Sequence, residues 1–372
     1  MSKAAELANL IGNINAGGGG NNRNVIINGA MNIAQRSTSE TGKGDAAGYF
    51  TCDRWRITLG SEDSSTQAGR FTMSQDSSAP SGFTNSLKID CTTDDTSIAT
   101  GERLMLLQRI EGQNLQAFAK GTTDAKPFAV SFYVKGNASA TYTCELFDVD
   151  NTRQMSKTFN VTTDWTRVEL TFPADTTGAF NHDTDDSLHL NIFLHAGATY
   201  NGGTLNSTSF ASSTNANRAS GTQTSIFDST DRTFFITGVQ LEVGQNPTEF
   251  EHEPVEKTLA KCQRYTYRIN GNTSDDTMIG AGYHQATTQF RAIAHFPVTM
   301  VGHPTVTTND ADLILLRDTT SDASVTLDST LDESEHNCGL NISGVTSTTV
   351  GEGGILRLDN TATAFIQFDA EI

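Results

Sequence analysis

The sequence predicts an all-β protein, a jelly-roll β-sandwich followed by a smaller β-sandwich-like C-terminal domain. Short stretches that alternate apolar and polar residues recur along the 372 residues, and such alternation is typical of half-buried strands. Segments rich in Thr, Ser, Asn, Asp and Gly separate these stretches, as turns do. Helix-type spacing is confined to a short N-terminal helix and a linking helix near 254–265. A length of 372 residues corresponds to two or three domains of about 150 residues.

Residues 1–22 predict an anchoring helix followed by a Gly-rich tether. A helix between Ser2 and Ile14 is marginal in water on its own, so its apolar stripe needs a partner. The Gly-rich segment 16–22 forms a flexible tether. We expect the stripe to dock onto a particle or onto other copies of the chain, although a frayed terminus or a helix packed on its own domain is the alternative. The stripe consists of Leu7, Leu10, Ile11 and Ile14.

Residues 23–252 predict the jelly-roll domain. The first strand is expected at 24–34 and a polar loop at 35–49. A helical turn at 111–120 and a long polar insert at 199–228 are expected between strands. The last strand returns beside the first to close one two-sheet core. The remaining strands are expected at 50–59, 70–75, 86–91, 102–110, 128–135, 142–148, 155–161, 166–172, 188–194 and 232–243.

Residues 253–372 predict a C-terminal β-domain with a leading helix. Pro254 suits the first position of a helix, where its missing N–H costs nothing. Val255, Leu259 and Cys262 follow at helix spacing. Short strands are expected at 265–269, 278–283, 289–296, 304–308, 313–317, 340–343, 355–358 and 364–370.

Composition restricts the partners. The chain has 43 acidic and 25 basic residues and a net charge of −18, which argues against nucleic acid and against an anionic membrane surface. We find no apolar run that predicts a signal peptide or membrane insertion. Five widely spaced cysteines without a CxxC motif predict free, buried thiols in a protein made in a reducing cytoplasm. They are Cys52, Cys91, Cys144, Cys262 and Cys338.

Four motifs carry a resemblance to a known class of proteins. In chain order they are NVIINGAMNIAQRST, CDRWRI, LLQRIEGQNLQAF…KPFAVSFYVKG and ITGVQLEVG…PTEFEHEP…LAKCQRY, within residues 24–265. Together they resemble virion fibre and tail proteins of tailed bacteriophages. The resemblance implies a jelly-roll domain similar to carbohydrate-binding modules, displayed on a virus particle.

The resemblance implies a structural and adhesive role. The expected form is a tail fibre or similar appendage that attaches through its N-terminus and binds a host-surface glycan. Together with the N-terminal stripe, it predicts a homotrimer that contacts other virion structural proteins. Such a protein is made in the host cytoplasm and is released in the virion by lysis. A head fibre, a capsid decoration protein and a surface-polysaccharide depolymerase are the alternatives.

Residue clusters that could carry chemistry favour neither a metal nor an enzyme. Asp183, Asp185 and Asp186, beside His182 and His189, could offer oxygen ligands to Ca²⁺. The run lacks the Gly and Glu of an EF-hand loop, so a solvated loop is the preferred interpretation. His189 and His195 have no Cys or Glu at metal spacing and are expected to be structural or surface residues. No GxSxG, HExxH or P-loop motif occurs, and a non-catalytic protein without cofactors is expected.

Carbohydrate-binding modules of this type often hold a structural calcium ion. Ala30 stands where the resemblance would place an acidic residue, and Thr237-Gly238 replaces an Asp pair. These two departures give no ground for predicting such a calcium ion.

Receptor contact is expected from exposed aromatic side chains and loops, because sugars stack on aromatic planes. Trp55 and Trp165 lie in strand-like contexts and are expected to be buried. Tyr200, inside the polar insert, is the preferred exposed aromatic, and the C-terminal loops around His303 and Asn337 are the other candidate receptor-facing surfaces. The remaining tyrosines expected to be exposed are Tyr49, Tyr142, Tyr267 and Tyr283.

Overall fold

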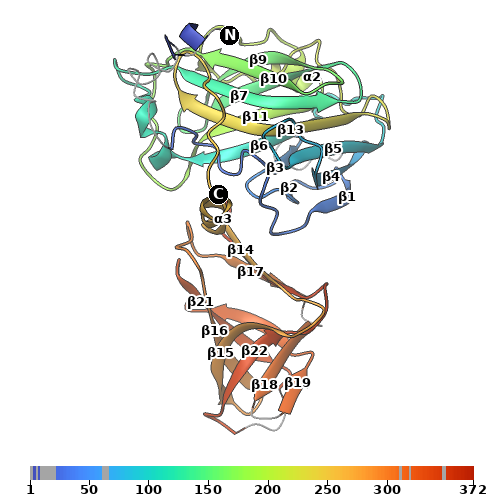
Figure 1. Cartoon of the computed structure of the whole chain (residues 1–372), viewed down its shortest axis with the longest axis vertical. Coiled ribbons are helices and arrows are strands. Elements are labelled where there is room, and N and C mark those ends of the chain that lie inside the picture. The colour runs from blue at the N-terminus through green and yellow to red at the C-terminus, as the bar shows by residue number, and fades with distance from the viewer. Residues whose placement is uncertain are drawn as a thin grey trace. The chain divides into compact units, whose positions relative to one another are not determined.

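The computed structural model describes residues 3–5, 7–8, 22–60, 67–309, 312–317, 320–345 and 349–372. The chain divides into two compact units, Met1–Thr258 and Leu259–Ile372. The division falls inside helix α3 (Val255–Gln263), a few residues after the domain boundary predicted at 252. Each unit has its own hydrophobic core. Strands dominate both units (Figure 1), which confirms the predicted all-β class.

The described residues of unit 1 form two antiparallel sheets, one of six strands and one of seven, stacked as a sandwich. The chain passes from one sheet to the other between β5 and β6, between β6 and β7, and between β7 and β8, as in a jelly roll. The six-stranded sheet has the order β1 (Ser39–Lys43), β4 (Arg70–Asp76), β5 (Ser86–Thr93), β13 (Thr233–Val243), β7 (Phe128–Gly136), β10 (Thr166–Phe172). The seven-stranded sheet has the order β12 (Ala211–Ser212), β9 (Arg153–Val161), β8 (Ala140–Asp148), β11 (Asp186–Ala196), β6 (Arg103–Glu111), β3 (Arg56–Leu59), β2 (Gly48–Tyr49).

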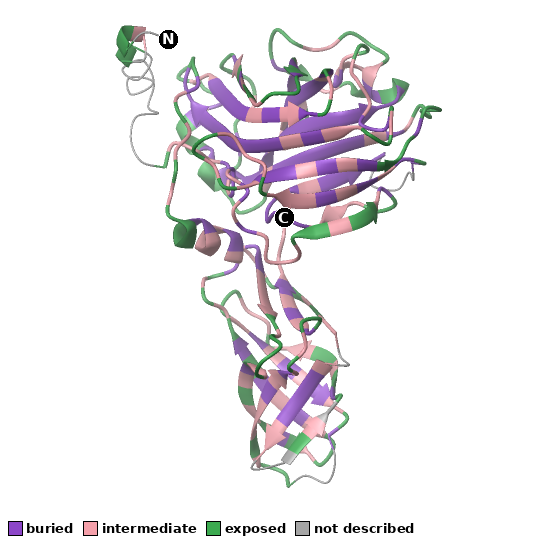
Figure 2. Ribbon diagram, turned by 45° about the vertical axis from the view of Figure 1, so that its right-hand side comes forward, coloured by how far each residue is buried: buried purple, intermediate pink, exposed green. Residues whose placement is uncertain are grey.

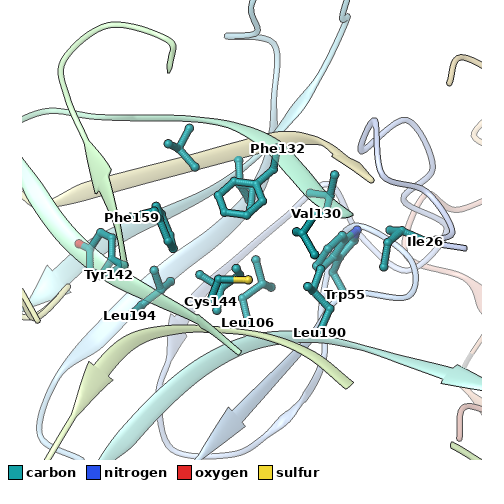
Figure 3. Packing of buried hydrophobic residues seen from close by; sticks show 14 of the residues in the cluster. Ile26, Trp55, Leu106, Val130, Phe132, Tyr142, Cys144, Phe159, Leu190 and Leu194 are labelled. Atoms are coloured by element: carbon teal, nitrogen blue, oxygen red, sulfur yellow. The ribbon is translucent and has the colours of Figure 1, made fainter. Parts of the chain in front are cut away.

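The core of unit 1 lies between the two sheets (Figure 3). Phe132 from one sheet and Leu106 from the other are both fully buried, and burying such a side chain contributes about 1.5–3 kcal/mol. Trp55 has no exposed surface, as predicted. Trp165 is only half-buried, because it lies before β10 with its ring edge-on to Phe235. All five cysteines of the chain are buried thiols, as predicted.

The segment predicted as the first strand belongs to neither sheet. It runs beside β13, since the Val25 N–H donates to the Leu241 carbonyl and the Val239 N–H donates to the Gly29 carbonyl, both at 3.0 Å. Asn28 has a φ of 56°, in the left-handed region that interrupts an extended strand. The prediction of a strand at 24–34 is therefore wrong.

The polar stretch 35–49, predicted as a loop, contains strands β1 and β2. β1 pairs with β4 at the edge of its sheet, with Ser39 opposite Ser74 and Lys43 opposite Phe71. An edge strand needs little apolar surface, because only one side is paired and solvent covers the rest. The polar composition of β1 therefore gives no strand pattern in the sequence.

Short helices occupy the connections. The 3₁₀ turns η2 (Gly112–Asn114) and η3 (Gln116–Phe118) confirm the helical turn predicted at 111–120. The long insert contains α2 (Ala198–Asn201) and η4 (Asn215–Asn217).

Unit 2 forms a three-stranded and a seven-stranded antiparallel sheet from its described residues. Its two edge strands, β19 (Thr320–Ala323) and β20 (Thr326–Leu331), are not among the strands that the sequence predicts. The smaller sheet has the order β14 (Thr266–Asn270), β23 (Phe365–Asp369), β17 (Thr305–Thr308). The larger has the order β19 (Thr320–Ala323), β18 (Leu313–Arg317), β22 (Gly353–Leu358), β15 (Thr277–Ala286), β16 (Gln289–His295), β21 (Asn337–Ser343), β20 (Thr326–Leu331).

Helix α3 begins where Pro254 predicts it. The Pro254 carbonyl accepts hydrogen bonds from the N–H groups of Lys257 at 3.0 Å and Thr258 at 3.2 Å. At the N-terminus, the described residues 3–5 and 7–8 are helical and Leu7 is exposed. The other stripe residues, Leu10, Ile11 and Ile14, lie outside the described residues. No helix in the described part of the chain is long and apolar enough to span a membrane.

Candidate binding pocket of unit 1

The long insert packs on the outer face of the seven-stranded sheet. Tyr200 and Ala219 from the insert form a second apolar cluster with Met105, Leu107 and Phe193, which point away from the main core. Because of this cover, β6 and β11 are buried on both faces over most of their length (Figure 2). The insert thus forms part of the sheet surface instead of projecting into solvent.

Tyr200 is 1% exposed, so the expectation of an exposed aromatic is wrong. Its ring lies under the Arg103 guanidinium, at 4.7 Å from ring centroid to Cζ. An apolar ring is more stable on the apolar patch of the sheet than in water. The insert therefore packs the Tyr200 ring against this patch. Tyr142, also expected to be exposed, is fully buried in the main core.

A pocket of about 250 Å³ lies on this outer face. The floor of the pocket consists of rows of residues that are paired across neighbouring strands. Arg109, His189 and Phe147 are paired across β6, β11 and β8. Two residues further along, Leu107 and Asn191 form the next row. Residues two apart share a face of a strand, so both rows point outward. The lining consists of Arg56, Thr58, Arg103, Met105, Leu107, Arg109, Phe147, His189, Asn191 and Arg218.

Arg218, from the insert, is fixed by a buried carboxylate. Its Nε and Nη2 donate to the two oxygens of Glu145, both at 2.8 Å. Its guanidinium also stacks over the Phe147 ring at 4.6 Å and faces the Phe193 ring at 5.6 Å. Burial acts to lower the pKa of Arg218, but the Glu145 charge outweighs burial and holds that pKa above its ordinary value. The two parallel hydrogen bonds therefore hold the Arg218 guanidinium in a fixed orientation.

Asn191 lies buried beneath the floor of the pocket. Its Nδ2 donates to Glu145 Oε2 at 2.7 Å, which fixes the orientation of the amide. Its Oδ1 is buried and has no hydrogen-bond partner, and the whole residue has no exposed surface. A buried polar atom without a partner costs free energy.

His189 and Asp186 form the other charged pair beside the pocket. His189 Nε2 donates to Asp186 Oδ2 at 2.5 Å, and Arg109 Nε lies 3.6 Å from the same oxygen. Burial lowers the pKa of His189 below its ordinary value, although Asp186 acts in the opposite direction. Burial acts to raise the pKa of Asp186, but His189 and Arg109 outweigh it and lower that pKa. At neutral pH the imidazole is uncharged and the carboxylate is ionised.

The predicted acidic cluster is divided by the start of β11. His182, Asp183 and Asp185 are exposed in the preceding turn, whereas Asp186 begins β11 and contacts His189, which lines the pocket. Across the described residues, no group of three or more His, Cys, Asp or Glu side chains is placed to hold a metal ion.

The candidate receptor residues of unit 2 lie apart from this pocket in the chain. His303 is exposed in a loop, and Asn337 is half-buried at the start of β21, opposite His295. Tyr283 in β15 is 49% exposed. Contact with a receptor stays a prediction for these residues.

Four arginines of the pocket were missed by sequence reasoning. Arg103 and Arg109 share the outward face of β6 with Met105 and Leu107, so the period of two in this strand did contain the signal. Arg56 precedes Ile57 in β3 and Arg218 lies in the insert. Their convergence needed the pairing of β3 with β6 and the folding of the insert onto the sheet.

No family model and no curated protein sequence matches the chain. Among solved structures, the enzymatically active domain of tailspike protein 4 from bacteriophage CBA120 is similar at 11% identity and a TM-score of 0.31, over 59% of this chain and 21% of that chain. A structure described as "CBM4 structure and function" has 12% identity and a TM-score of 0.31, over 58% and 97%. The TmCBM61 complex with beta-1,4-galactotriose has 10% identity and a TM-score of 0.29, over 59% and 99%. This chain therefore spans about a fifth of the tailspike chain. Because these identities and TM-scores are low, the jelly-roll fold of unit 1 is assigned from its own strand order.

Proposed function

We propose that unit 1 binds a host-surface glycan in its outer-face pocket, and that the chain is a structural and adhesive protein of a bacteriophage particle. A tail fibre or similar appendage is the proposed form. The observation that carries the proposal is the pocket itself. It combines the half-buried ring of Phe147 with the fixed guanidinium of Arg218, and saccharides are bound by aromatic faces with precisely oriented polar neighbours.

The size of the pocket is consistent with a sugar unit. Pockets for drug-sized ligands have volumes of about 300–1,000 Å³, whereas this one has about 250 Å³. One unit of a polysaccharide would enter, and the rest of the polymer would extend over the sheet and the insert.

Binding without cleavage is the proposed activity. Hydrolysis of a glycosidic bond requires two carboxyl groups about 5–9.5 Å apart across the sugar. None of the ten described residues that line the pocket is acidic. The nearby carboxylates Glu145 and Asp186 are each engaged by an arginine. This arrangement favours an adhesin over a depolymerase.

The partners in the particle belong to the same proposal. The chain forms a homotrimer, contacts other virion structural proteins through its N-terminal helix, and is released in the virion by lysis. The motifs between residues 24 and 265 support this assignment. A head fibre or capsid decoration protein would use the same anchor, and cryo-EM of the particle separates these locations.

The glycan-binding proposal is tested on an array of printed bacterial surface oligosaccharides with the full chain. The wild type is expected to bind at least one glycan, and Phe147→Ala is expected to weaken that binding about tenfold, since one stacking contact contributes about 1 kcal/mol or more. Trp165→Ala, a half-buried aromatic before β10 of the other sheet, is the control and should bind as wild type. Melting temperatures verify folding. Equal binding by wild type and Phe147→Ala, or binding to no glycan, contradicts the proposal.

A further inference from the structure

We propose that unit 2 holds a second saccharide-binding site, on the outer face of its seven-stranded sheet, where Tyr283, Arg291 and Asn341 form one row. The ligand is a hydroxyl-rich sugar unit of a surface glycan, which stacks on the Tyr283 ring. All three residues belong to unit 2, so the inference does not rest on the pocket of unit 1.

Strand pairing places the three side chains next to one another. Tyr283 in β15 is paired with Arg291 in β16, and Arg291 is paired with Asn341 in β21. Residues that are directly opposite across two strands share a face of the sheet, with Cβ atoms about 4.5–5.5 Å apart. Phe290 and Ala292, on either side of Arg291 in the chain, are buried in the core of unit 2. The row therefore points outward, away from that core.

Tyr283 presents an accessible ring. It is 49% exposed, and no other Phe, Trp or Tyr side chain in the described part of the chain is as exposed. On the β22 side its partner is Gly353, which has no side chain. A Cβ added to Gly353 would meet nothing nearer than the Gly282 carbonyl oxygen, at 3.8 Å. A ligand can therefore approach the ring from this side.

Arg291 and Asn341 supply hydrogen-bond donors beside the ring. Both residues are half-buried, and neither side chain makes a hydrogen bond or ion pair within the described part of the chain. Arg291 Nε is buried, but its two terminal nitrogens are not. Asn341 Oδ1 is also buried, whereas its Nδ2 is not. The accessible ends of both side chains are therefore donors that lack an acceptor.

A sugar unit satisfies every part of this row. Its C–H face covers an aromatic ring, and its hydroxyl oxygens accept hydrogen bonds from neighbouring polar side chains. An inorganic anion would leave the Tyr283 ring uncovered, and an apolar protein segment would leave the donors of Arg291 without acceptors. Because the three side chains stand on paired strands and not on loops, their spacing is fixed before a ligand binds.

A purely structural role is the alternative for Tyr283, since aromatic residues are common in strands. Such a ring would be expected to pack on a neighbouring ring or cation. Tyr283 makes no ring contact with an aromatic or cationic side chain in the part of the chain that the structure describes. The structural role is therefore tested against binding by variants that keep or remove the ring.

The experiment measures binding of the full chain, over a series of protein concentrations, to the array of printed bacterial surface oligosaccharides. At least one glycan is expected to bind Tyr283→Ala about tenfold more weakly than wild type, because one stacking contact is lost. The same glycan should bind Arg291→Met at least tenfold more weakly, because a charge-assisted hydrogen bond is lost. Tyr283→Phe keeps the ring and should bind as wild type. Met278→Ala removes a side chain of β15 that is 64% exposed and is the matched control, which should also bind as wild type.

The outcomes separate this site from the pocket of unit 1. A glycan weakened by Tyr283→Ala and Arg291→Met supports the second site, whether Phe147→Ala leaves it unchanged or weakens it too. Unchanged binding of every glycan to Tyr283→Ala and Arg291→Met overturns the second site, and the pocket is then judged by Phe147→Ala alone. An equal loss in Met278→Ala shows non-specific apolar adhesion and also overturns it. Binding to no glycan overturns both proposals. Melting temperatures verify folding, and if Tyr283→Ala melts early, Arg291→Met decides.

Discussion

His195 is a buried histidine that couples the stability of unit 1 to pH. Its Nδ1 lies 2.8 Å from Ser225 Oγ, and its Nε2 lies 3.4 Å from Glu102 Oε2. The residue has no exposed surface. Burial lowers its pKa to about 4, although the charge of Asp95 acts in the opposite direction. The unfolded chain restores the ordinary value of about 6.5.

We therefore expect unit 1 to lose stability as the pH falls from about 6.5 to about 4. In this interval the unfolded chain binds a proton at His195 and the folded chain does not, so protonation favours unfolding. The contribution is about 3 kcal/mol. Urea unfolding of the wild type at pH 7 and pH 4.5 is compared with that of His195→Gln, in which this part of the pH dependence disappears. Identical pH dependence in the two proteins would show that His195 is not responsible.

Lys120 is a second residue whose burial has a measurable consequence. Its side chain has no exposed surface, and its Nζ lies 2.5 Å from Asp148 Oδ2 and 3.3 Å from Asp175 Oδ2. The ammonium also donates to the carbonyls of Thr177 at 2.9 Å and Gly178 at 2.7 Å. Four oxygens thus surround one cation, in an arrangement that resembles the shell of a bound metal ion.

Replacing this cation leaves a buried carboxylate without compensation. We expect Lys120→Met to lower the free energy of unfolding of unit 1 by about 3–5 kcal/mol. The double variant Lys120→Met/Asp148→Asn should recover part of the lost stability, because it also removes the negative charge of Asp148. Lys157→Met, at a half-exposed position in β9, is the control and should change stability by less than about 1 kcal/mol. Full stability of Lys120→Met would contradict this account.

At the scale of elements, the segment before β1 depends on one asparagine. Asn28 is buried and has a left-handed backbone. Its Nδ2 donates to the carbonyls of Ile33 at 2.8 Å and Asp53 at 3.0 Å, and its Oδ1 accepts from the Ile33 N–H at 3.0 Å. Its own carbonyl accepts from Trp55 Nε1 at 3.2 Å. One side chain thus joins the segment to the start of β3.

Asn28→Ala should lower the free energy of unfolding by about 3 kcal/mol, since it removes three hydrogen bonds of about 1 kcal/mol each and places alanine at a positive φ. Asn32→Ala is the control, because Asn32 makes one long side-chain contact, at 3.3 Å from Asn85, and should cost less than about 1 kcal/mol. Chemical denaturation measures both. A loss in Asn28→Ala no greater than that in Asn32→Ala would mean that the segment is held mainly by its apolar residues.

The elements show where sequence patterns are sufficient. Strands with central apolar alternation, such as β7, β10 and β13, are predicted nearly to their ends, because their pattern reflects burial between the sheets. The segment 24–34 has equally good strand formers, but distant partners of Asn28 determine its backbone. The polar edge strand β1 is specified by its pairing with β4. In both cases the deciding contact lies outside the local pattern.

The pocket was harder to predict than the fold. Its arginines are separated by up to 162 positions between Arg56 and Arg218, and no local motif joins them. The polar insert around Tyr200 predicts an exposed contact residue, yet the Tyr200 ring packs against the sheet. A search for basic residues in phase with the apolar residues of β6 would have found Arg103 and Arg109.

At the scale of the whole chain, unit 1 closes on itself before the chain enters unit 2. The PTEFEHEP motif supplies this closure. Glu251 Oε2 accepts from the Asn24 N–H at 2.9 Å, and the Glu251 N–H donates to Gln240 Oε1 at 2.8 Å. Thr248 is tied to Glu242 in β13 by an N–H bond of 2.6 Å. The beginning and end of the jelly roll are thereby joined through Glu251, by contacts with Asn24 and Gln240.

We therefore expect residues 1–21 to be dispensable for folding but required for assembly. Sedimentation equilibrium of the full chain should give about three times the 40.0 kDa mass of one chain, if the apolar stripe of the N-terminal helix joins the copies. A chain that begins at Asn22 should sediment as a monomer and keep its melting temperature within about 2 °C of the full chain. Its affinity for glycan, per pocket, should be unchanged. It should fail to join the particle. Leu10→Ser/Ile14→Ser in the full chain tests the stripe without shortening it. A monomeric full chain would contradict the trimer, and a truncated chain that stays trimeric would place the contact in unit 1 or unit 2.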